Sequence, residues 1–443
     1  EEVTFTATPS SPYVGLLLMG CGDRDKADAE TIRRCAGKAV DALRKARATR
    51  VLIDMSGKPE WLLGAFIEGL MLGQYRFARY KSLPKDNVPT SIEELVVIVE
   101  SDEQAPSLKE YALRIAKVCC CTNWARDLAN MSSNEMTPGQ LAYEAKALAG
   151  QFGLVYECLD TGRMGELGMH ALLGVARGSA EPPRLIILEY RFGDSAPTLA
   201  MVGKGITFDT GGVSIKPADH MHEMKFDMCG AAAVLGAMKV VAQMRPPINV
   251  VCVIPATENV VDARAQKPGD IVRAYNKKTI EVHNTDAEGR LILADAMAYV
   301  VDTYRPDKMV DIATLTGACV VALGHYAAGV TSTSEELFSA LQDASNTVGE
   351  RIWRLPLWDD YAKLMEGTHA DLCNIGPARE AGAVTAACFL KEFVSDTPWA
   401  HIDIAGTAWG VKNVSYLDTN SATGFGVRLL TEWIRREAEA QAR

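Results

Sequence analysis

Short apolar runs that suit buried strands alternate along the chain with longer stretches that suit helices, and this alternation restricts the fold more than any other feature. The pattern is typical of an α/β protein, in which helices cover a sheet. The helical period is clearest over residues 288–304, where apolar residues recur about every 3.6 positions. The candidate strands are residues 13–19, 50–55, 95–99, 185–190, 198–202, 248–254 and 309–312, and the candidate helices are residues 28–45, 61–72, 108–128, 230–244 and 288–304.

A polar, acidic stretch at residues 101–106 divides this pattern into two parts. We expect a smaller N-terminal α/β domain over residues 1–105, a connector helix over residues 106–128 and a larger C-terminal α/β domain over residues 129–443. A chain of 443 residues is long enough for two or three domains of ordinary size.

The composition argues against several classes of protein. Apolar residues make up 48% of the chain and charged residues 23%, as in ordinary folded proteins. The formal net charge of −10 disfavours a general attraction to nucleic acid or to an anionic membrane. No run approaches the roughly 18 apolar residues of a membrane span. The apolar residues 14–21 lack the preceding positive charges of a signal peptide, so a buried strand is expected there.

The cysteine pattern predicts neither a cysteine-based metal site nor a set of disulfide bonds. Eleven are present, and they are scattered apart from Cys119, Cys120 and Cys121. No C-x-x-C pair lies near a histidine, so a zinc ribbon is not predicted. Buried thiols in a reducing, cytoplasmic compartment are the better interpretation.

Two glycine-rich segments, residues 202–234 and 283–291, carry the chemistry of the chain. The first follows the candidate strand 198–202, so its early residues leave the carboxyl end of a strand, where open α/β sheets bind ligands. The second leads into the candidate helix 288–304, with two acidic residues two positions apart. The residues of interest are Lys204, Asp209, Asp227, Asp286, Glu288 and Arg290.

Four of these residues are carboxylates, and two interpretations of them remain open. Asp209, Asp227, Asp286 and Glu288 could be helix caps and solvated turn residues, as most acids beside glycine are. Brought together, four negative charges would repel one another, and two divalent cations would neutralise them. An oxygen-rich set without cysteine would suit Zn, Mn, Mg or Co in a paired hydrolytic site.

Several stretches of the sequence resemble the leucyl aminopeptidase (cytosol aminopeptidase) family of hexameric, two-metal exopeptidases. The strongest are NTDAEGRL at residues 284–291 and GKGITFDTGG, SIKP and MKFDMCGAAAV between residues 203 and 234. Further matching stretches follow in the family's order: GLMLGQYRFARYKS at 69–82, ARDLANMSSNEMTP at 125–138, DIATLTGA at 311–318 and WAHIDIAG at 399–406. The resemblance covers most of the chain and is weakest over roughly the first 60 residues.

The resemblance implies a set of metal ligands. Lys204, Asp209, Asp227 and Glu288 would bind a slowly exchanging metal, and Asp209, Asp286 and Glu288 a readily exchanging one, with Asp209 and Glu288 as bridges. The plainer interpretation of Lys204 is a charge partner for the acids, because an amine is a ligand only when deprotonated. The metals would be Zn or Mn, with Mg or Co as alternatives.

The resemblance also implies a mechanism in which a metal-bridged water attacks the peptide carbonyl. Lys216 would act as the electrophile that stabilises the developing oxyanion. Arg290, with Gly289 and Leu315, would hold a bicarbonate ion that shuttles the proton. The alternative role of Arg290, a salt bridge on a helix surface, fits this motif less well.

The remaining implications concern substrate and assembly. Met224, Asn284, Thr314, Gly317 and Ala405 would form the pocket for the N-terminal side chain, and their small or apolar character favours Leu and Met. The fold would be a macro-like N-terminal domain and a catalytic domain with a mixed central sheet, assembled as a homohexamer. The partners would be peptides with a free N-terminus. Two alternatives stay open: an additional DNA-binding architectural role, and a two-metal hydrolase of another substrate class.

Overall fold

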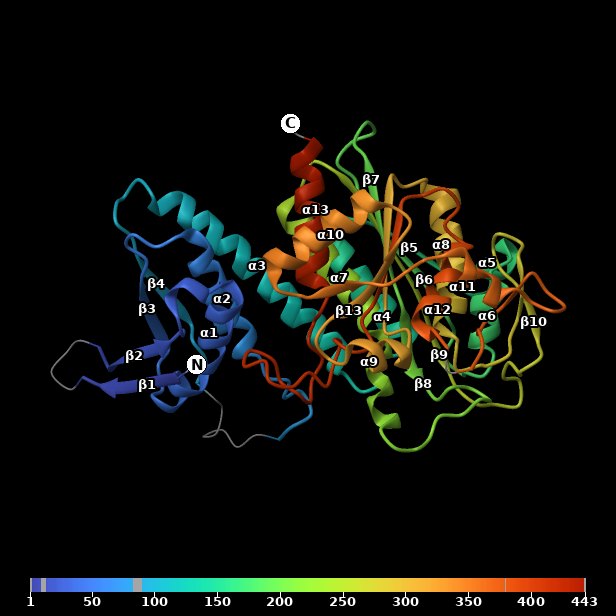
Figure 1. Cartoon of the computed structure of the whole chain (residues 1–443), viewed down its shortest axis with the longest axis horizontal. Coiled ribbons are helices and arrows are strands. Elements are labelled where there is room, and N and C mark those ends of the chain that lie inside the picture. Colours follow the sequence, from blue (N-terminus) through green and yellow to red (C-terminus); the bar gives the residue numbers. More distant parts are fainter. Residues whose placement is uncertain (1, 9–12, 83–89, 379, 442–443) are drawn as a thin grey trace. The chain divides into compact units, whose positions relative to one another are not determined.

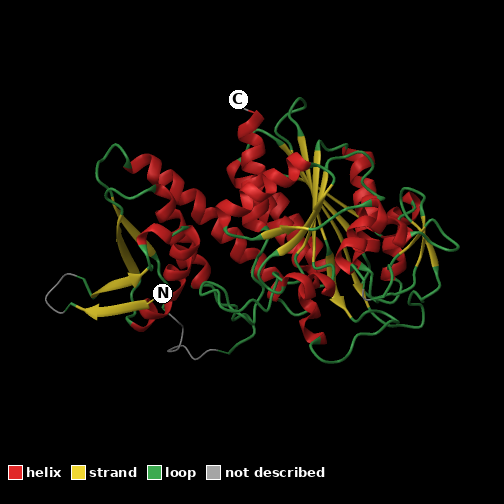
Figure 2. Cartoon of the chain, viewed as in Figure 1, coloured by secondary structure: helices red, strands yellow, loops and turns green. Residues whose placement is uncertain are grey.

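The computed structural model describes residues 2–8, 13–82, 90–378 and 380–441, and it divides into two compact units (Figure 1). The first unit comprises Glu1–Asn123 and Val411–Ser421, and the second comprises Trp124–Gly410 and Ala422–Arg443. Helix α3 (Ala105–Asn130) begins in the first unit and ends in the second, because the change from one unit to the other falls after Asn123. Each unit contains both strands and helices (Figure 2).

The first unit is a small α/β structure. Strands β1 (Glu2–Ala7) and β2 (Gly15–Gly20) form an antiparallel pair, and β3 (Arg50–Asp54) and β4 (Glu94–Ile98) form a parallel pair. Its helices are the short η1 (Arg24–Lys26), α1 (Ala29–Lys45) and α2 (Glu60–Gly73). Asp28 is the N-cap residue of α1, and its side chain accepts a hydrogen bond from the N–H of Thr31 at 2.8 Å. This bond stabilises the start of the helix.

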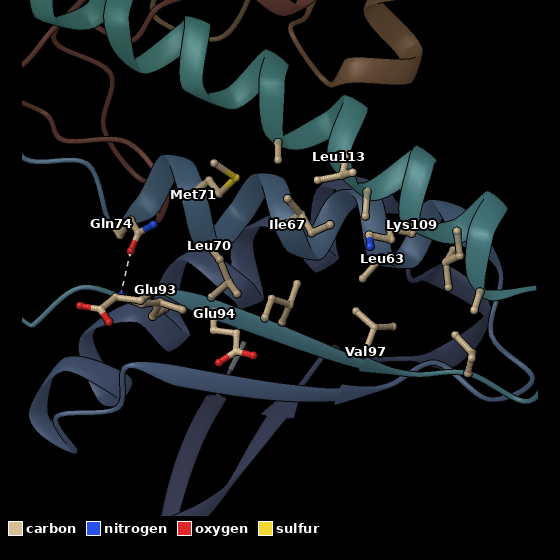
Figure 3. A pocket seen from close by; sticks show the side chains of 17 residues that line it. Leu63, Ile67, Leu70, Met71, Gln74, Glu93, Glu94, Val97, Lys109 and Leu113 are labelled. Carbon is tan, nitrogen blue, oxygen red and sulfur yellow. Dashed lines mark hydrogen bonds between the residues drawn. The ribbon is translucent and has the colours of Figure 1, made fainter. Parts of the chain in front are cut away.

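A cavity of about 520 Å³ lies in this unit between α2, β4 and the first half of α3 (Figure 3). Its walls are mainly aliphatic, and Leu63, Ile67 and Val97 are among them. Gln74 lies at one end, where its side-chain oxygen accepts the N–H of Ile92 at 3.2 Å. Its charged lining residues are Glu93, Glu94 and Lys109.

The second unit is built on a nine-stranded mixed sheet. Its four central strands run parallel to one another: β16 (Trp399–Asp403), β12 (Lys308–Ala313), β7 (Thr198–Gly203) and β9 (Asn249–Asn259). The edges are mixed. β6 (Arg184–Tyr190), β5 (Val155–Leu159) and β13 (Ala328–Ser332) join by antiparallel pairing, and β14 (Ile352–Arg354) and β8 (Gly205–Asp209) pair in parallel with β13 and β9.

A small three-stranded sheet lies apart from the large one. Its strands are β10 (Ile271–Arg273), β11 (Thr279–Glu281) and β15 (Leu372–Cys373), and β11 leads directly into the segment 283–288. The parallel pairing of Ile280 with Leu372 and of Glu281 with Cys373 brings the residues after β15 beside that segment.

Helices cover both faces of the large sheet (Figure 1). On one side lie α6 (His170–Ala176), α8 (Gly289–Tyr304) and α12 (Gly382–Lys391), and their apolar residues pack on Val202, Val253 and Trp399. On the other side lie α4 (Pro138–Phe152), α7 (Cys229–Met244), α10 (Glu335–Val348) and α13 (Val427–Gln441). Shorter elements complete the unit: α5 (Thr161–Leu167), η3 (Met221–Met228), α9 (Gly317–Leu323), α11 (Asp359–Ala362) and η4 (Lys363–Met365).

One helical stretch, Met221–Met244, is long and apolar enough to cross a membrane, but 89% of its apolar window is buried inside the protein. That burial is typical of a core helix. The contact with the sheet is close because Gly230 has no side chain. A Cβ atom on Gly230 would come within 2.2 Å of the Ile312 carbonyl oxygen and 2.9 Å of the Lys204 nitrogen. The absence of a Cβ therefore lets α7 begin directly against the ends of β7 and β12.

The α/β fold class expected from the sequence is confirmed. Each candidate strand and helix corresponds to an observed element, with ends that differ by a few residues. The strand expected to be buried at residues 14–21 is β2, and it is not buried on both faces, because Leu16 and Leu18 are 55% and 56% exposed. Glu288 is the N-cap residue of α8 and not part of its first turn. The strands that sequence reasoning did not find are β1, β5, β8, β10, β11, β13, β14, β15 and the central β16, none of which is longer than six residues. These strands depend on neighbours distant in the sequence more than on a long apolar run.

A fully buried carboxylate in α8 ties three elements of the second unit together. The two oxygens of Asp295 accept the N–H groups of Leu172, in α6, and of Tyr275, between β10 and β11, each at 2.8 Å. Burial raises the pKa of Asp295 to about 7, although these backbone donors oppose the shift.

The raised pKa of Asp295 predicts a pH-dependent stability. Unfolded aspartate titrates near pH 3.9, so the contribution of this group is full below about pH 4 and is lost as pH rises through about 7. We expect the wild-type melting temperature to fall relative to that of Asp295→Asn between about pH 4.5 and 7, and then to run parallel to it. Calorimetry of both proteins checks this, with the exposed Asp343→Asn as control. A difference that does not change with pH would contradict it.

Candidate metal centre

The site lies where the central strands of the large sheet end. β7 ends at Gly203, so Lys204 emerges at its carboxyl end, and β8 carries the chain on to Asp209. The backbone of Lys204 is held on both sides, because its N–H donates to Ile312 in β12 and its carbonyl accepts from Ala231 in α7. The site is therefore anchored at the carboxyl ends of the central parallel strands.

The remaining acidic residues come from two other connections. Asp227 lies at the end of η3, just before α7, and Asp286 and Glu288 lie between β11 and α8. Ligand atoms of Asp209, Asp286 and Glu288 lie within 4.8 Å of one another. In the described part of the chain, no other group of three or more His, Cys, Asp or Glu side chains is this close together.

Two lysines are placed between these carboxylates. Nζ of Lys204 lies 2.8 Å from both Asp227 Oδ1 and Glu288 Oε1, and it donates to the Thr314 carbonyl at 2.9 Å. Nζ of Lys216 lies 2.7 Å from Asp209 Oδ2 and also contacts Asp286. The structure therefore brings all four predicted carboxylates and both predicted lysines into one cluster.

The electrostatics of the cluster show an excess of negative charge. Burial, together with the charge of Glu288, raises the pKa of Asp209 to about 6, and burial also raises the pKa values of Asp227 and Asp286. For Glu288, burial is outweighed by Lys204 and Lys216, which lower its pKa. Burial lowers the pKa values of both lysines, but the neighbouring carboxylates outweigh it and raise them. Both amines are therefore ammonium groups in this arrangement.

The donor set fits divalent metal ions. Two ammonium groups stand against four carboxylates, so negative charge remains to be neutralised. Asp227 Oδ2 is buried and has no hydrogen-bond partner, which leaves one carboxylate oxygen free to take a ligand. Carboxylate oxygens suit Mg, Mn or Zn better than softer cations.

Asn259 joins two of the ligand segments, and sequence reasoning missed it. Its side-chain nitrogen donates to Asp209 Oδ1 at 2.8 Å and to the Thr285 carbonyl at 3.0 Å. Thr285 in turn donates its hydroxyl to the Gly211 carbonyl at 2.7 Å. An asparagine at the end of an apolar strand gave no sequence signal, because its role depends on segments far away in the chain.

Asp403 is a second residue that the sequence did not reveal. It lies at the end of β16, accepts the N–H of Leu315 at 3.2 Å and accepts the Thr316 hydroxyl at 2.6 Å. It therefore holds the turn whose Thr314 carbonyl accepts from Lys204. The turn also carries the Thr314 hydroxyl, which donates to Asp227 Oδ1 at 2.7 Å.

Arg290 lies in the first turn of α8 and is buried. Its Nη1 donates to the Asn374 carbonyl at 2.8 Å, and its Nε has no hydrogen-bond partner. Burial lowers the pKa of Arg290 to about 10, although Glu288 and Asp403 oppose the shift. The neighbouring Gly289 allows close packing, since a Cβ there would lie 2.8 Å from Lys204 Nζ.

A cavity of about 660 Å³ opens beside the carboxylate cluster. Five of the predicted site residues line it: Asn284, Asp286, Arg290, Leu315 and Gly317. The rest of the wall is mostly small or aliphatic and includes Val321, Leu355 and Ile375. The predicted pocket residues Met224, Thr314 and Ala405 are not among its lining residues.

The histidines stay outside the carboxylate cluster. His220 and His222 are stacked on each other near Glu223, and His283 contacts Glu281 at 2.8 Å. His401 is buried in the sheet, where its Nδ1 lies 2.7 Å from Asp311. None of these belongs to the close group of possible ligands among the described residues.

The fold and the carboxylate cluster are those of a metal-dependent hydrolase, and comparison with known proteins identifies the class. A model of the catalytic domain of the cytosol aminopeptidase family matches residues 123–431, and a model of that family's N-terminal domain matches residues 1–84. The chain therefore belongs to the cytosol aminopeptidase family and is a metallo-aminopeptidase.

Individual relatives match over nearly the whole chain. A probable cytosol aminopeptidase of Syntrophotalea carbinolica is 44% identical over 444 residues, which cover 99% of this chain and 88% of the relative. One from Solibacter usitatus is 46% identical over 419 residues, which cover 94% and 85%. The solved structure of the bottromycin maturation enzyme BotP in complex with Mn has a TM-score of 0.89 and 34% identity, with 99% of this chain and 93% of that chain covered.

The raised pKa of Asp209 predicts that protons compete with metal. A metal ion binds the ionised carboxylate, so below about pH 6 the affinity should fall more steeply with pH, by about a further tenfold per pH unit for the proton displaced from Asp209. Titration calorimetry with Mn²⁺ between about pH 5 and 7.5 measures this. Asp209→Asn should bind more weakly throughout and show a flatter pH profile. Equal wild-type affinity across the range would contradict the prediction.

Proposed function

We propose that this chain is a two-metal leucyl aminopeptidase that removes Leu, Met and similar apolar residues from peptide N-termini. One observation carries the proposal: four carboxylates from three separate connections converge beside a cavity with mostly small and aliphatic walls. Membership of the cytosol aminopeptidase family supports it.

The proposed ligands are those of the cluster. Lys204, Asp209, Asp227 and Glu288 would hold one cation, and Asp209, Asp286 and Glu288 the other, with Zn or Mn favoured over Mg or Co. When bound, such cations lower the pKa of water and polarise a carbonyl oxygen. The structure of BotP in complex with Mn supports manganese as one candidate. Lys204 would have to lose its proton to act as a ligand; otherwise it neutralises Asp227 and Glu288 as it does here.

Lys216 is the proposed electrophile. Its raised pKa keeps it an ammonium group, which can donate to a carbonyl oxygen but cannot act as a base. It lies on a turn with glycines at positive φ, Gly211 at 88° and Gly212 at 67°. Its backbone N–H donates to the Thr210 carbonyl at 2.9 Å, so the turn places Nζ against Asp209 and Asp286.

Arg290 is the proposed holder of a bicarbonate ion, which when bound would supply a group able to accept and donate a proton beside the cavity. Support comes from a buried guanidinium with an unpartnered Nε beside the cavity. Gly289 and Leu315 would complete this anion site through their backbone. Met224, Asn284, Thr314, Gly317 and Ala405 would select the substrate side chain, and Asn284 and Gly317 already line the cavity.

The finer organisation is also a proposal. We keep the division into residues 1–105 as a macro-like domain, 106–128 as a connector helix and 129–443 as the catalytic domain, with a homohexamer as the assembly. A cytoplasmic location is supported by the names of relatives called cytosol aminopeptidases. The DNA-binding alternative receives no support from these relatives or from the net charge of −10.

The proposed activity predicts a defined substrate profile. The full chain loaded with Mn²⁺ should cleave leucine p-nitroanilide but neither its N-acetyl derivative nor p-nitrophenyl phosphate, because only a free α-amino group could coordinate one of the cations held by the carboxylate cluster. Dialysis against a chelator should abolish cleavage, and Mn, Co or Zn should restore it. Full activity in metal-stripped protein, or cleavage of the acetylated substrate at a similar rate, would overturn the proposal.

Replacing Lys216 should separate catalysis from metal binding. Lys216→Ala should lower kcat by about 100-fold or more, because the removed ammonium group would stabilise charge only in the transition state. Bound metal, measured by elemental analysis, should stay near the wild-type value. The exposed Lys146→Ala in α4 serves as the control. A parallel loss of metal and activity would assign Lys216 to metal retention.

A further inference from the structure

Asn374 lies immediately after β15, beside the segment that connects β11 to α8. The ladder between β11 and β15 pairs Glu281 with Cys373, and the N–H of Asn374 donates to the Glu281 carbonyl at 2.9 Å. This backbone bond places the Asn374 side chain against residues 283–290. That segment carries Asp286, Glu288 and Arg290.

The side chain of Asn374 is fully buried and bonds only to the backbone of this segment. Its Oδ1 accepts the N–H of His283 at 2.8 Å and that of Asn284 at 3.3 Å. Its Nδ2 donates to the Asn284 carbonyl at 2.7 Å and to the Ala287 carbonyl at 3.4 Å. Both acceptor positions and both donor hydrogens of the amide are therefore used.

The backbone of the same residue reaches the proposed anion site. The Asn374 carbonyl accepts from Arg290 Nη1 at 2.8 Å, while Arg290 Nε has no partner. Asn374 thus contacts the backbone on both sides of Asp286 and also the guanidinium that follows Glu288. Thr285 ties this segment to the turn after Asp209 from another direction, through its bonds to Gly211 and Ser214.

The segment 283–288 belongs to no helix or strand, so its conformation depends on such side-chain bonds. Alanine at 374 would leave four backbone groups without these partners: the N–H groups of His283 and Asn284 and the carbonyls of Asn284 and Ala287. Aspartate would keep the shape and the acceptors but would lose both donors to the Asn284 and Ala287 carbonyls.

We propose that Asn374 is a positioning residue for the metallo-aminopeptidase reaction, which holds Asp286, Glu288 and Arg290 in the geometry that binds metal and acts on substrate. The predicted effect of Asn374 on catalysis rests on the proposed function. The predicted effect on metal binding does not, because metal affinity can be measured without a substrate. Replacing a residue that orients metal ligands typically lowers metal affinity or activity by about 10–100-fold.

The chain offers a matched control. Asn249, at the start of β9, makes the same four-bond pattern with the loop between β6 and β7. It accepts from Phe192 and Gly193 and donates to Gly193 and Ala196, at distances of 2.7 to 3.2 Å. That loop leads into the amino end of β7, whereas the metal centre lies at its carboxyl end.

The experiment compares the full chain with Asn374→Ala, Asn374→Asp and Asn249→Ala. Titration calorimetry gives the Mn²⁺ dissociation constant, hydrogen exchange follows the amides of residues 283–290 in metal-stripped protein, and kinetics on leucine p-nitroanilide give kcat and KM. For both Asn374 variants we expect the Mn²⁺ dissociation constant to rise by about 10-fold or more and the amides of residues 283–290 to exchange faster. We also expect kcat to fall by about 10-fold or more, while KM stays within about threefold of the wild-type value. Asn249→Ala should lower the melting temperature and leave these values unchanged.

The outcomes separate the possible roles. Mn²⁺ affinity and exchange in 283–290 that match those of Asn249→Ala would overturn the inference and leave Asn374 a purely structural residue. If Asn374→Ala does not fold, Asn374→Asp, which keeps the side-chain shape, decides the question. If the wild-type chain binds Mn²⁺ but cleaves no aminoacyl anilide, the proposed function fails, while the Mn²⁺ affinities and exchange rates still decide the role of Asn374.

Discussion

The crowding of four carboxylates in a mostly buried cluster is the constraint on which the rest of the second unit depends. Asp209, Asp227 and Glu288 are each at most 5% exposed, so water screens their repulsion poorly. Lys204 and Lys216 offset part of it, and each is shared between two carboxylates. The negative charge that remains favours the binding of further cations, and this is the physical basis of the proposed metal dependence.

The fold supports this crowding by where its elements begin. Asp227 lies just before α7, and Glu288 is the N-cap residue of α8. Helix N-termini carry a partial positive charge, so both carboxylates lie where a negative charge is favoured. The parallel central strands place Lys204, Asn259 and Asp403 near the same sheet edge, because their carboxyl ends meet there.

Around the charged groups runs a layer of neutral and acidic side chains that bond mainly to backbone. Asn259 joins the Asp209 and Thr285 segments, and Asp403 orients the turn that holds Thr314. Such bonds cost little entropy to maintain, because the side chains are already immobilised by burial. They make the geometry of the cluster a property of the folded unit and not of any single loop.

The first unit contains a cavity of a different kind, with mainly aliphatic walls and no close group of possible metal ligands among its described residues.

The sequence by itself determined the α/β class, part of the set of strands and helices and the identity of the charged residues, because these follow from local apolar periodicity and from short motifs such as NTDAEGRL. It also placed Asp209, Asp286 and Glu288 in one expected site, which the structure brings within ligand distance. It did not reveal the central strand β16 or the helices α4, α6, α10 and α12 that cover the sheet. Only the tertiary structure decided that Lys204 and Lys216 each bridge two carboxylates, that Thr314 bonds to Asp227, and that Asn259 and Asp403 position the ligand segments. These polar contacts join residues up to 87 positions apart. No local pattern records such a distant pairing, because each partner is an ordinary polar residue until the sheet brings the two together.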